Sequence, residues 1–165
     1  IGALISLEHL EKVESYIKLG VEEGGTILTG GTREMTGHVT AAIHGAFLRP
    51  TIIDGLHHTS RTSTEEIFGP VVTVHRFDSD EQAIEMANST AYGLAGSIWS
   101  TNIDRAHGLA QQIETGIIWV NTWLHRDLRT PFGGVKNSGV GREGGNWSLG
   151  FFSEPLNVCI KHDQE

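Results

Sequence analysis

Residues 65–70, Glu65-Glu66-Ile67-Phe68-Gly69-Pro70, lead directly into the apolar run Val71 to Val74, which predicts a buried strand. A second loop, Asn121 to Gly134 (NTWLHRDLRTPFGG), follows another apolar run, Gly116 to Val120. Between the two loops the pattern alternates strand, helix, strand, helix and strand. We therefore expect an α/β fold with a mostly parallel sheet, helices on both faces, and the two loops together at one sheet edge.

Periodicity and turn residues place the individual elements. An amphipathic helix is predicted over residues 6–19, with Ser6 as its N-cap and Gly20 as its stop. A second helix follows Asp78 or Ser79 and buries Ala83, Ile84 and Ala87. A third follows Thr101 or Asn102 and buries Ile103, Ala106, Leu109, Ala110 and Ile113.

Strands are predicted at 26–28, 47–53, 71–77, 95–99, 116–120 and 156–161. Residues 30–46 are expected to form a loop with at most one strand. Pro50 places the second strand at an edge or a bulge.

Length and charge exclude several classes of protein. The 165 residues suit one domain, and the net charge of -8 argues against nucleic acid or an anionic membrane as partner. No apolar run approaches the roughly 20 residues of a membrane helix, and the N-terminal residues lack the basic flank and cleavage site of a signal peptide. The single Cys159 excludes an internal disulfide and indicates a reducing, cytoplasmic location. The absent initiator Met predicts a fragment of a longer protein.

Two further patterns do not support the sites that they suggest. The chain has nine histidines, including His57 and His58, but no pair with the spacing of helical metal ligands, so no metal is predicted. Gly139 to Gly144 matches G-x-G-x-x-G, yet no strand leads into it and too little chain follows for a dinucleotide-binding unit. We expect these glycines to form a turn before a helix at 146–152.

Four motifs occur in one order along nearly the whole chain: Glu65 to Val71 (EEIFGPV), Tyr92 to Ala95 (YGLA), Gly116 to Asn121 (GIIWVN) and Pro131 to Gly139 (PFGGVKNSG). Together they resemble the C-terminal third of an NAD(P)-dependent aldehyde dehydrogenase. The resemblance implies residues 1–152 as part of the catalytic domain and 153–165 as an oligomerisation strand and tail. It also implies a homodimer or homotetramer.

The resemblance implies a mechanism whose central groups lie outside this sequence. In that family a Cys thiolate attacks the aldehyde, a hydride passes to NAD, and a Glu-activated water hydrolyses the thioester. The thiolate, the base and the nucleotide-binding sheet are all expected upstream of Ile1. Cys159 does not match the nucleophile, so no catalytic residue is assigned here. The chain alone is expected to be inactive, and the choice between NAD and NADP stays open.

The resemblance assigns the cofactor contacts to two residues of the first loop. Glu66 matches the family carboxylate that accepts hydrogen bonds from the nicotinamide ribose hydroxyls, and Phe68 matches the aromatic near the nicotinamide. Without the resemblance, the alternative is that Glu65 and Glu66 are a solvated pair and that Phe68 is a core residue.

The second loop is expected to bind a small-molecule aldehyde. Phe132 matches a residue that lines the substrate tunnel, and Asn121, Gly133 and Gly134 are expected to shape the backbone. Arg126 and Arg129 stand in a W-x-x-R-D-L-R run that resembles the 2-hydroxymuconic and 2-aminomuconic semialdehyde dehydrogenases. Their substrates carry a carboxylate, which a guanidinium binds well. The alternative is that both arginines form structural ion pairs.

Two other functions remain open. A fragment without nucleophile and nucleotide sheet could act as an association module, since the alternating segment Leu156 to Lys161 would expose an unpaired edge. A betaine aldehyde dehydrogenase is a further alternative, but its cationic substrate does not favour two arginines in the tunnel.

Overall fold

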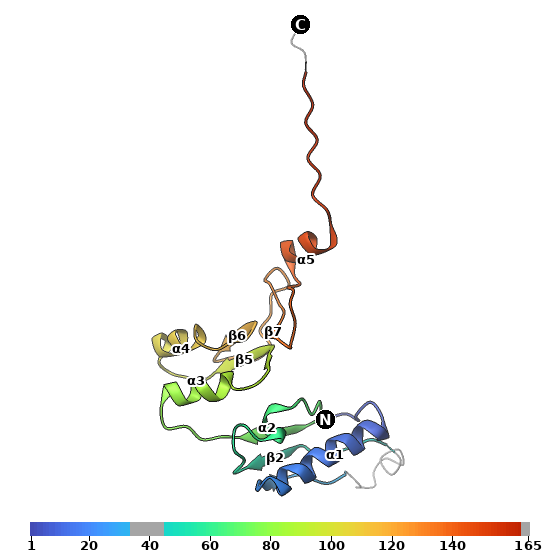
Figure 1. Cartoon of the computed structure of the whole chain (residues 1–165), viewed down its shortest axis with the longest axis vertical. Coiled ribbons are helices and arrows are strands. Elements are labelled where there is room, and N and C mark those ends of the chain that lie inside the picture. Colours follow the sequence, from blue (N-terminus) through green and yellow to red (C-terminus); the bar gives the residue numbers. More distant parts are fainter. Residues whose placement is uncertain (34–44, 163–165) are drawn as a thin grey trace. The chain divides into compact units, whose positions relative to one another are not determined.

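The computed structural model describes residues 1–33 and 45–162, and the chain divides into two compact units, Ile1–Thr90 and Ala91–Glu165 (Figure 1). Each unit contains a parallel strand pair together with helices, which confirms the predicted α/β class. Within the described residues, no helix has the length and apolar character needed to cross a membrane.

The sheet of the first unit has three strands in the order β1-β2-β3. These are β1 (Thr26–Thr29), β2 (Thr51–Asp54) and β3 (Val71–Val74). β1 runs antiparallel to β2, and β2 runs parallel to β3 with Thr51 opposite Val71. The strands predicted at 26–28 and 71–77 are therefore present, although β3 ends three residues earlier.

The edge position predicted for the Pro50 strand is wrong, whereas a register shift interrupts the pairing of β1 with β2 between Ile27 and Thr29, in line with the bulge given as the alternative. β2 begins after Pro50 and is the central strand of its sheet, not an edge strand. Proline has no N–H to give to a ladder, so pairing starts at the next residue, where Thr51 N donates to Pro70 O at 2.8 Å. Residues 34–44, most of the predicted 30–46 loop, lie outside the described part of the chain.

The first helix, α1 (Leu7–Glu22), begins as predicted, because the Ser6 side chain accepts a hydrogen bond from His9 N at 3.0 Å. The predicted stop at Gly20 is wrong. Gly20 is buried inside the helix, where an added Cβ would lie 3.0 Å from Ile53 Cδ1. The helix ends before Gly24, whose φ of 95° suits glycine. Gly20 thus permits close packing rather than a turn.

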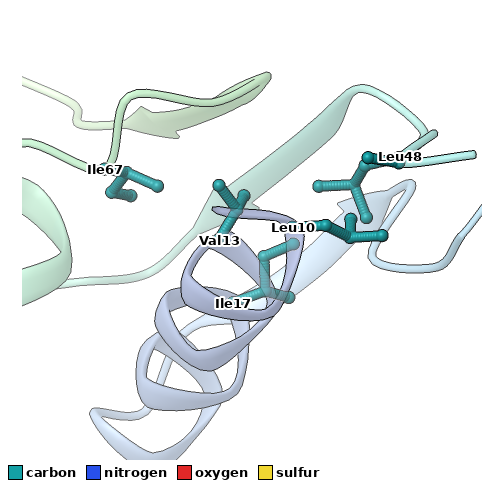
Figure 2. Packing of buried hydrophobic residues seen from close by; sticks show 6 residues of the cluster. Leu10, Val13, Ile17, Leu48 and Ile67 are labelled. Carbon is teal, nitrogen blue, oxygen red and sulfur yellow. The ribbon is translucent and has the colours of Figure 1, made fainter. Parts of the chain in front are cut away.

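One apolar face of α1 forms the core of the first unit. Leu10, Val13 and Ile17 pack with Leu48 and with Ile67 of the loop 65–70 (Figure 2). Burial of Ile67 therefore ties this loop to the helix. α2 (Arg61–Thr64) directly precedes the loop.

The next helix, α3 (Asp80–Asn88), has Ser79 as its N-cap, as predicted. Its predicted buried stripe is only partly confirmed, because Ala83 and Ile84 are half-buried and Ala87 is exposed.

The second unit contains two pairs of strands. β5 (Ala95–Ile98) pairs parallel with β6 (Ile117–Val120), and α4 (Ile103–Ala110) connects them with Asn102 as its N-cap. Of the predicted inward residues of α4, Ala106 is buried, whereas Ile103 is 62% exposed. Two short strands that the pattern did not predict, β4 (Tyr92–Gly93) and β7 (Val135–Lys136), pair antiparallel.

Residues 71–77 lie in the first unit of the chain, and the segments 95–99 and 116–120 lie in the second. β3 belongs to the sheet of β1 and β2, and β5 pairs with β6. The expectation of one sheet containing all three segments stays a prediction. The meeting of the two loops at one sheet edge stays a prediction.

The chain ends in α5 (Gly145–Phe152) and an extended segment (Figure 1). The helix predicted at 146–152 is confirmed. The strand predicted at 156–161 is not formed within the described residues, because this extended segment has no ladder partner there. Its alternating apolar residues Leu156, Val158 and Ile160 are 85%, 68% and 71% exposed.

Candidate functional site

Successive side chains of the loop 65–70 have different environments. Glu65 is half-buried, Glu66 is exposed, Ile67 is buried and Phe68 is 73% exposed. Phe68 has a positive φ of 59°, a left-handed backbone conformation that is uncommon for residues other than glycine. The two residues predicted to contact the cofactor therefore both extend away from the core, and the predicted alternative of Phe68 as a core residue is wrong.

The two glutamates of this loop have unlike partners. Glu65 accepts hydrogen bonds from Arg61 and Tyr16, and these hold the pKa of its carboxyl at about 2. Within the described residues, no hydrogen bond or ion pair engages the exposed Glu66 carboxylate. Glu65 is thus not half of a solvated pair of like charges. Glu66 presents its acceptor oxygens to solvent, as an acceptor of ribose hydroxyl hydrogen bonds requires.

The first residues of the loop 121–134 are held by hydrogen bonds to neighbouring backbone groups. Asn121, at the end of β6, has a φ of 54° and forms two side-chain hydrogen bonds with the Ser100 backbone, each of 2.8 Å. The Trp119 indole N–H donates to His125 O at 2.7 Å. The asparagine therefore stabilises the bend by which the chain leaves the sheet, in agreement with its expected role in backbone geometry.

Arg126 and Phe132, two predicted substrate residues, lie together. The Arg126 Cζ atom is 4.2 Å from the centroid of the Phe132 ring, and the same guanidinium donates to Glu143. Phe132 and Glu143 exchange two backbone hydrogen bonds of 2.8 Å each. Glu143 was not predicted as part of this loop's surroundings. Its only sequence signal was its place within the glycine-rich segment 139–144.

Arg129 has a different environment from Arg126. Its side chain is 88% exposed, and its Nε donates to both carboxylate oxygens of Asp127 at 2.9 and 3.1 Å. The hydrogen bonds from Arg129 lower the pKa of the Asp127 carboxyl. Each arginine thus has an acidic partner, which is the arrangement that the alternative of structural ion pairs describes.

The glycine-rich segment packs back onto the substrate loop. An added Cβ on Gly133 would lie 2.3 Å from Gly141 O, and one on Gly144 would lie 2.3 Å from Thr130 O. Arg142 also donates to Gly134 O at 2.7 Å. These glycines therefore allow close backbone approach, as expected of a turn before α5.

A hollow at the carboxyl ends of β2 and β3 is lined by three of the nine histidines. Asp54, His57, His58, His75 and Arg76 are among its lining residues. His57 Nδ1 lies 2.8 Å from Thr59 Oγ1, and Arg76 forms an ion pair with Asp54. Among the residues that the structure describes, no three His, Cys, Asp or Glu side chains are grouped to hold a metal ion.

The model of the aldehyde dehydrogenase family matches residues 1–158. This chain belongs to the aldehyde dehydrogenase family. The predicted family is therefore confirmed, and the parallel pairs β2-β3 and β5-β6 are portions of its fold.

Individual relatives agree with this assignment. The 2-hydroxymuconic semialdehyde dehydrogenase of Pseudomonas putida is 53% identical over 161 residues, 97% of this chain and 32% of the relative. The 2-aminomuconic 6-semialdehyde dehydrogenase of a Pseudomonas species is 51% identical over 164 residues, 99% of this chain and 33% of the relative. The predicted resemblance to the muconic semialdehyde group is thus confirmed.

A solved structure shows the same fold. The betaine aldehyde dehydrogenase of Staphylococcus aureus in complex with NAD+ matches with a TM-score of 0.86 and 39% identity, over 92% of this chain and 29% of that chain. The chain described here spans about a third of the length of the curated relatives that it matches.

Proposed function

We propose that this chain is the C-terminal third of an NAD-dependent dehydrogenase that oxidises a carboxylated, muconic-type semialdehyde to the acid. The observation that carries the proposal is the pair of guanidinium groups just before Phe132, in a family member that is 53% identical to a 2-hydroxymuconic semialdehyde dehydrogenase. A muconic semialdehyde carries a carboxylate, and a guanidinium matches its charge and its planar shape.

Glu66 and Phe68 would hold the nicotinamide end of NAD or NADP. The exposed Glu66 carboxylate offers acceptor oxygens to two ribose hydroxyls, and the 73% exposed Phe68 ring offers an apolar face beside it. When bound, the cofactor accepts the hydride from the aldehyde carbon. The residues of this chain bind and orient it, while the thiolate and the general base belong to the longer protein.

Arg129 is the better placed of the two arginines to bind the substrate carboxylate. Arg126 is engaged on both sides, by the Phe132 ring and by Glu143, and its side chain is 35% exposed. Arg129 is 88% exposed, and within the described part of the chain its guanidinium bonds Asp127 through Nε and Nη2. Phe132 would line the apolar part of the substrate tunnel, with Arg126 behind its ring.

The terminal segment 153–165 would join a partner subunit in a homodimer or homotetramer, as a tail to the catalytic portion 1–152. Its described part is extended and exposes Leu156, Val158 and Ile160 at alternate positions, the pattern of a strand that pairs with another chain. A cytoplasmic location for the protein agrees with the exposed free thiol of Cys159.

The direct experiment follows NADH formation with NAD and 2-hydroxymuconic semialdehyde, for the longer protein and for the 165-residue chain. The proposal expects turnover by the longer protein and none by the chain. No turnover by either, with self-association of the chain, would favour an association module instead. Turnover by the chain alone that disappears in Cys159→Ser would contradict the assignment of the nucleophile to the longer protein.

A further inference from the structure

The cofactor loop is held by backbone contacts to one stripe of α1. His9 and Lys12 are three residues apart, so their side chains emerge on the same side of the helix. His9 Nε2 lies 2.7 Å from Phe68 O, and because a carbonyl oxygen only accepts, the imidazole is the donor. Lys12 Nζ donates to Glu66 O at 3.3 Å. The backbone carbonyl groups of Glu66 and Phe68 are thus bonded to the helix, while the side chains of both residues stay exposed.

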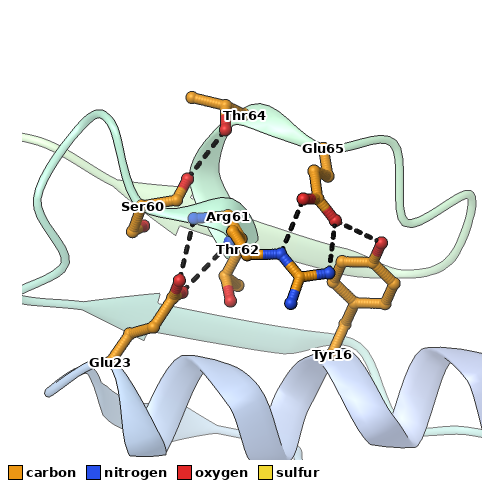
Figure 3. A network of polar contacts seen from close by, with 7 residues as sticks. All are labelled: Tyr16, Glu23, Ser60, Arg61, Thr62, Thr64 and Glu65. Atoms are coloured by element: carbon orange, nitrogen blue, oxygen red, sulfur yellow. Dashed lines mark hydrogen bonds and ion pairs between the residues drawn. The ribbon is translucent and has the colours of Figure 1, made fainter.

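A third contact from α1 engages the side chain of Glu65. Tyr16, four residues after Lys12, donates its hydroxyl proton to Glu65 Oε2 at 2.7 Å (Figure 3). Arg61 donates to the same carboxylate from Nε at 2.7 Å and from Nη2 at 3.0 Å. The carboxylate therefore lies between the helix α1 and the guanidinium of α2, and it accepts charge-assisted hydrogen bonds from the latter.

The α2 end of this network is itself tied to α1. The Glu23 carboxylate, at the C-terminal end of α1, accepts hydrogen bonds from Arg61 N at 2.8 Å and from Thr62 N at 3.1 Å (Figure 3). These are the first two backbone donors of a short helix, which a carboxylate satisfies well. Arg61 is thus fixed through both its backbone and its side chain.

Packing leaves the loop little freedom to move. Ile67 is buried in the core cluster with Val13. An added Cβ on Gly69 would lie 2.7 Å from Val13 Cγ2, so the loop backbone rests directly on the helix. Phe68 has a left-handed backbone conformation, and among the described residues His9 is the hydrogen-bond partner of its carbonyl oxygen.

We propose that Glu65, held by Tyr16 and Arg61, is a positioning residue that sets the place of the Glu66 carboxylate and thereby the affinity for the ribose of NAD. Glu65 and Glu66 are adjacent; the Glu65 carboxylate is bonded to Tyr16 and Arg61, whereas the Glu66 side chain is exposed. Fixing the first against α1 therefore orients the second toward the cofactor. This inference rests on the proposed function, because it takes Glu66 as the ribose-binding group.

The experiment compares Glu65→Gln and Tyr16→Phe with the unchanged full-length protein. Each substitution keeps the shape of the side chain and weakens the network. We expect the Kd for NAD and the KM for NAD to rise about 2- to 30-fold, the range for residues that act through a ligand-binding neighbour. The KM for the aldehyde should change little. In the double variant the effect should be less than additive, because both changes remove one network.

Glu14→Gln is the matched control. Glu14 lies on the same helix and forms a bidentate ion pair with Arg33, at 2.7 and 2.6 Å, but makes no described contact with the loop. Its loss should leave the Kd for NAD unchanged. Equal rises in the Kd for Glu14→Gln and Glu65→Gln would overturn the proposal. So would a lowered unfolding temperature in Glu65→Gln with an unchanged Kd.

Glu66→Gln separates this inference from the proposed function. If Glu66→Gln leaves the Kd for NAD unchanged, the ribose assignment itself is wrong. If Glu66→Gln weakens NAD binding while Glu65→Gln and Tyr16→Phe do not, the ribose assignment stands and the positioning role of Glu65 is refuted.

Discussion

The guanidinium of Arg126 lies over the ring of Phe132, with 4.2 Å between its Cζ atom and the ring centroid. The same guanidinium bonds Glu143, which is also the backbone partner of Phe132. Arg126 therefore links Phe132, which the family resemblance places in the substrate tunnel, to the glycine-rich segment that contains Glu143. A cation in this position typically contributes about 0.5–2 kcal/mol.

Arg126→Ala is predicted to lower kcat/KM by a similar factor for carboxylated and neutral aldehydes. The loss should be about 2- to 30-fold, because the missing contact orients Phe132 and not the substrate carboxylate. Steady-state kinetics with 2-hydroxymuconic semialdehyde and a neutral aldehyde measure both values. Arg126→Lys, which retains a cation, should lose less. A loss confined to the carboxylated substrate would show instead that Arg126 binds it.

Acid should weaken the first unit through Glu65. Arg61 and Tyr16 hold the pKa of Glu65 at about 2 in the folded state, against an ordinary value of 4.5. Between these values the unfolded chain binds a proton that the folded chain does not, so the contribution of Glu65 is complete above pH 4.5 and lost as the pH falls toward 2. Glu65→Gln should remove this dependence.

Thermal unfolding of the unchanged protein and of Glu65→Gln, measured side by side as the pH is lowered, tests this prediction. The difference in midpoint between the two proteins should shrink as the pH falls. A difference that stays constant from neutral pH to pH 2 would mean that Glu65 does not keep its lowered pKa.

Val158→Asp should reduce self-association. Val158 is 68% exposed in the extended terminal segment, between two further apolar residues at alternate positions. A carboxylate there would have to be buried against the partner, which is costly without a compensating charge. Light scattering after size exclusion gives the mass. Asn157→Asp, on the opposite side of the proposed strand, is the control and should retain the oligomer; equal masses for both variants would argue against the proposed pairing.

Local signals predicted much of this fold. The helix cap Ser6 was predicted from sequence, and Ser79 and Asn102 were each one of two predicted candidates, because a side-chain acceptor before an apolar stripe depends only on near neighbours. The stop at Gly20 and the edge position of the Pro50 strand were wrong for the opposite reason. Both depend on which distant segment packs there, such as Ile53 against Gly20.

In the candidate site, too, local motifs could be recognised from the sequence, whereas contacts between distant residues could not. The motifs proposed Glu66, Phe68 and Phe132 as ligand contacts through the family resemblance, and these contacts stay predictions. Glu143, which lies beside Arg126, could not be found, since their pairing depends on how the glycine-rich segment folds back. The contacts of Tyr16 with Glu65 were likewise invisible, because 49 residues separate the two in sequence.

The most direct test of the central claim is the substrate preference of Arg129→Ala in the full-length protein. The quantity is the ratio of kcat/KM for 2-hydroxymuconic semialdehyde to that for a neutral aldehyde of similar size. Loss of a charge-assisted contact to the carboxylate should lower this ratio by about tenfold to a hundredfold, with the neutral aldehyde nearly unaffected. An unchanged ratio in both Arg129→Ala and Arg126→Ala would contradict the proposal that this loop selects a carboxylated semialdehyde.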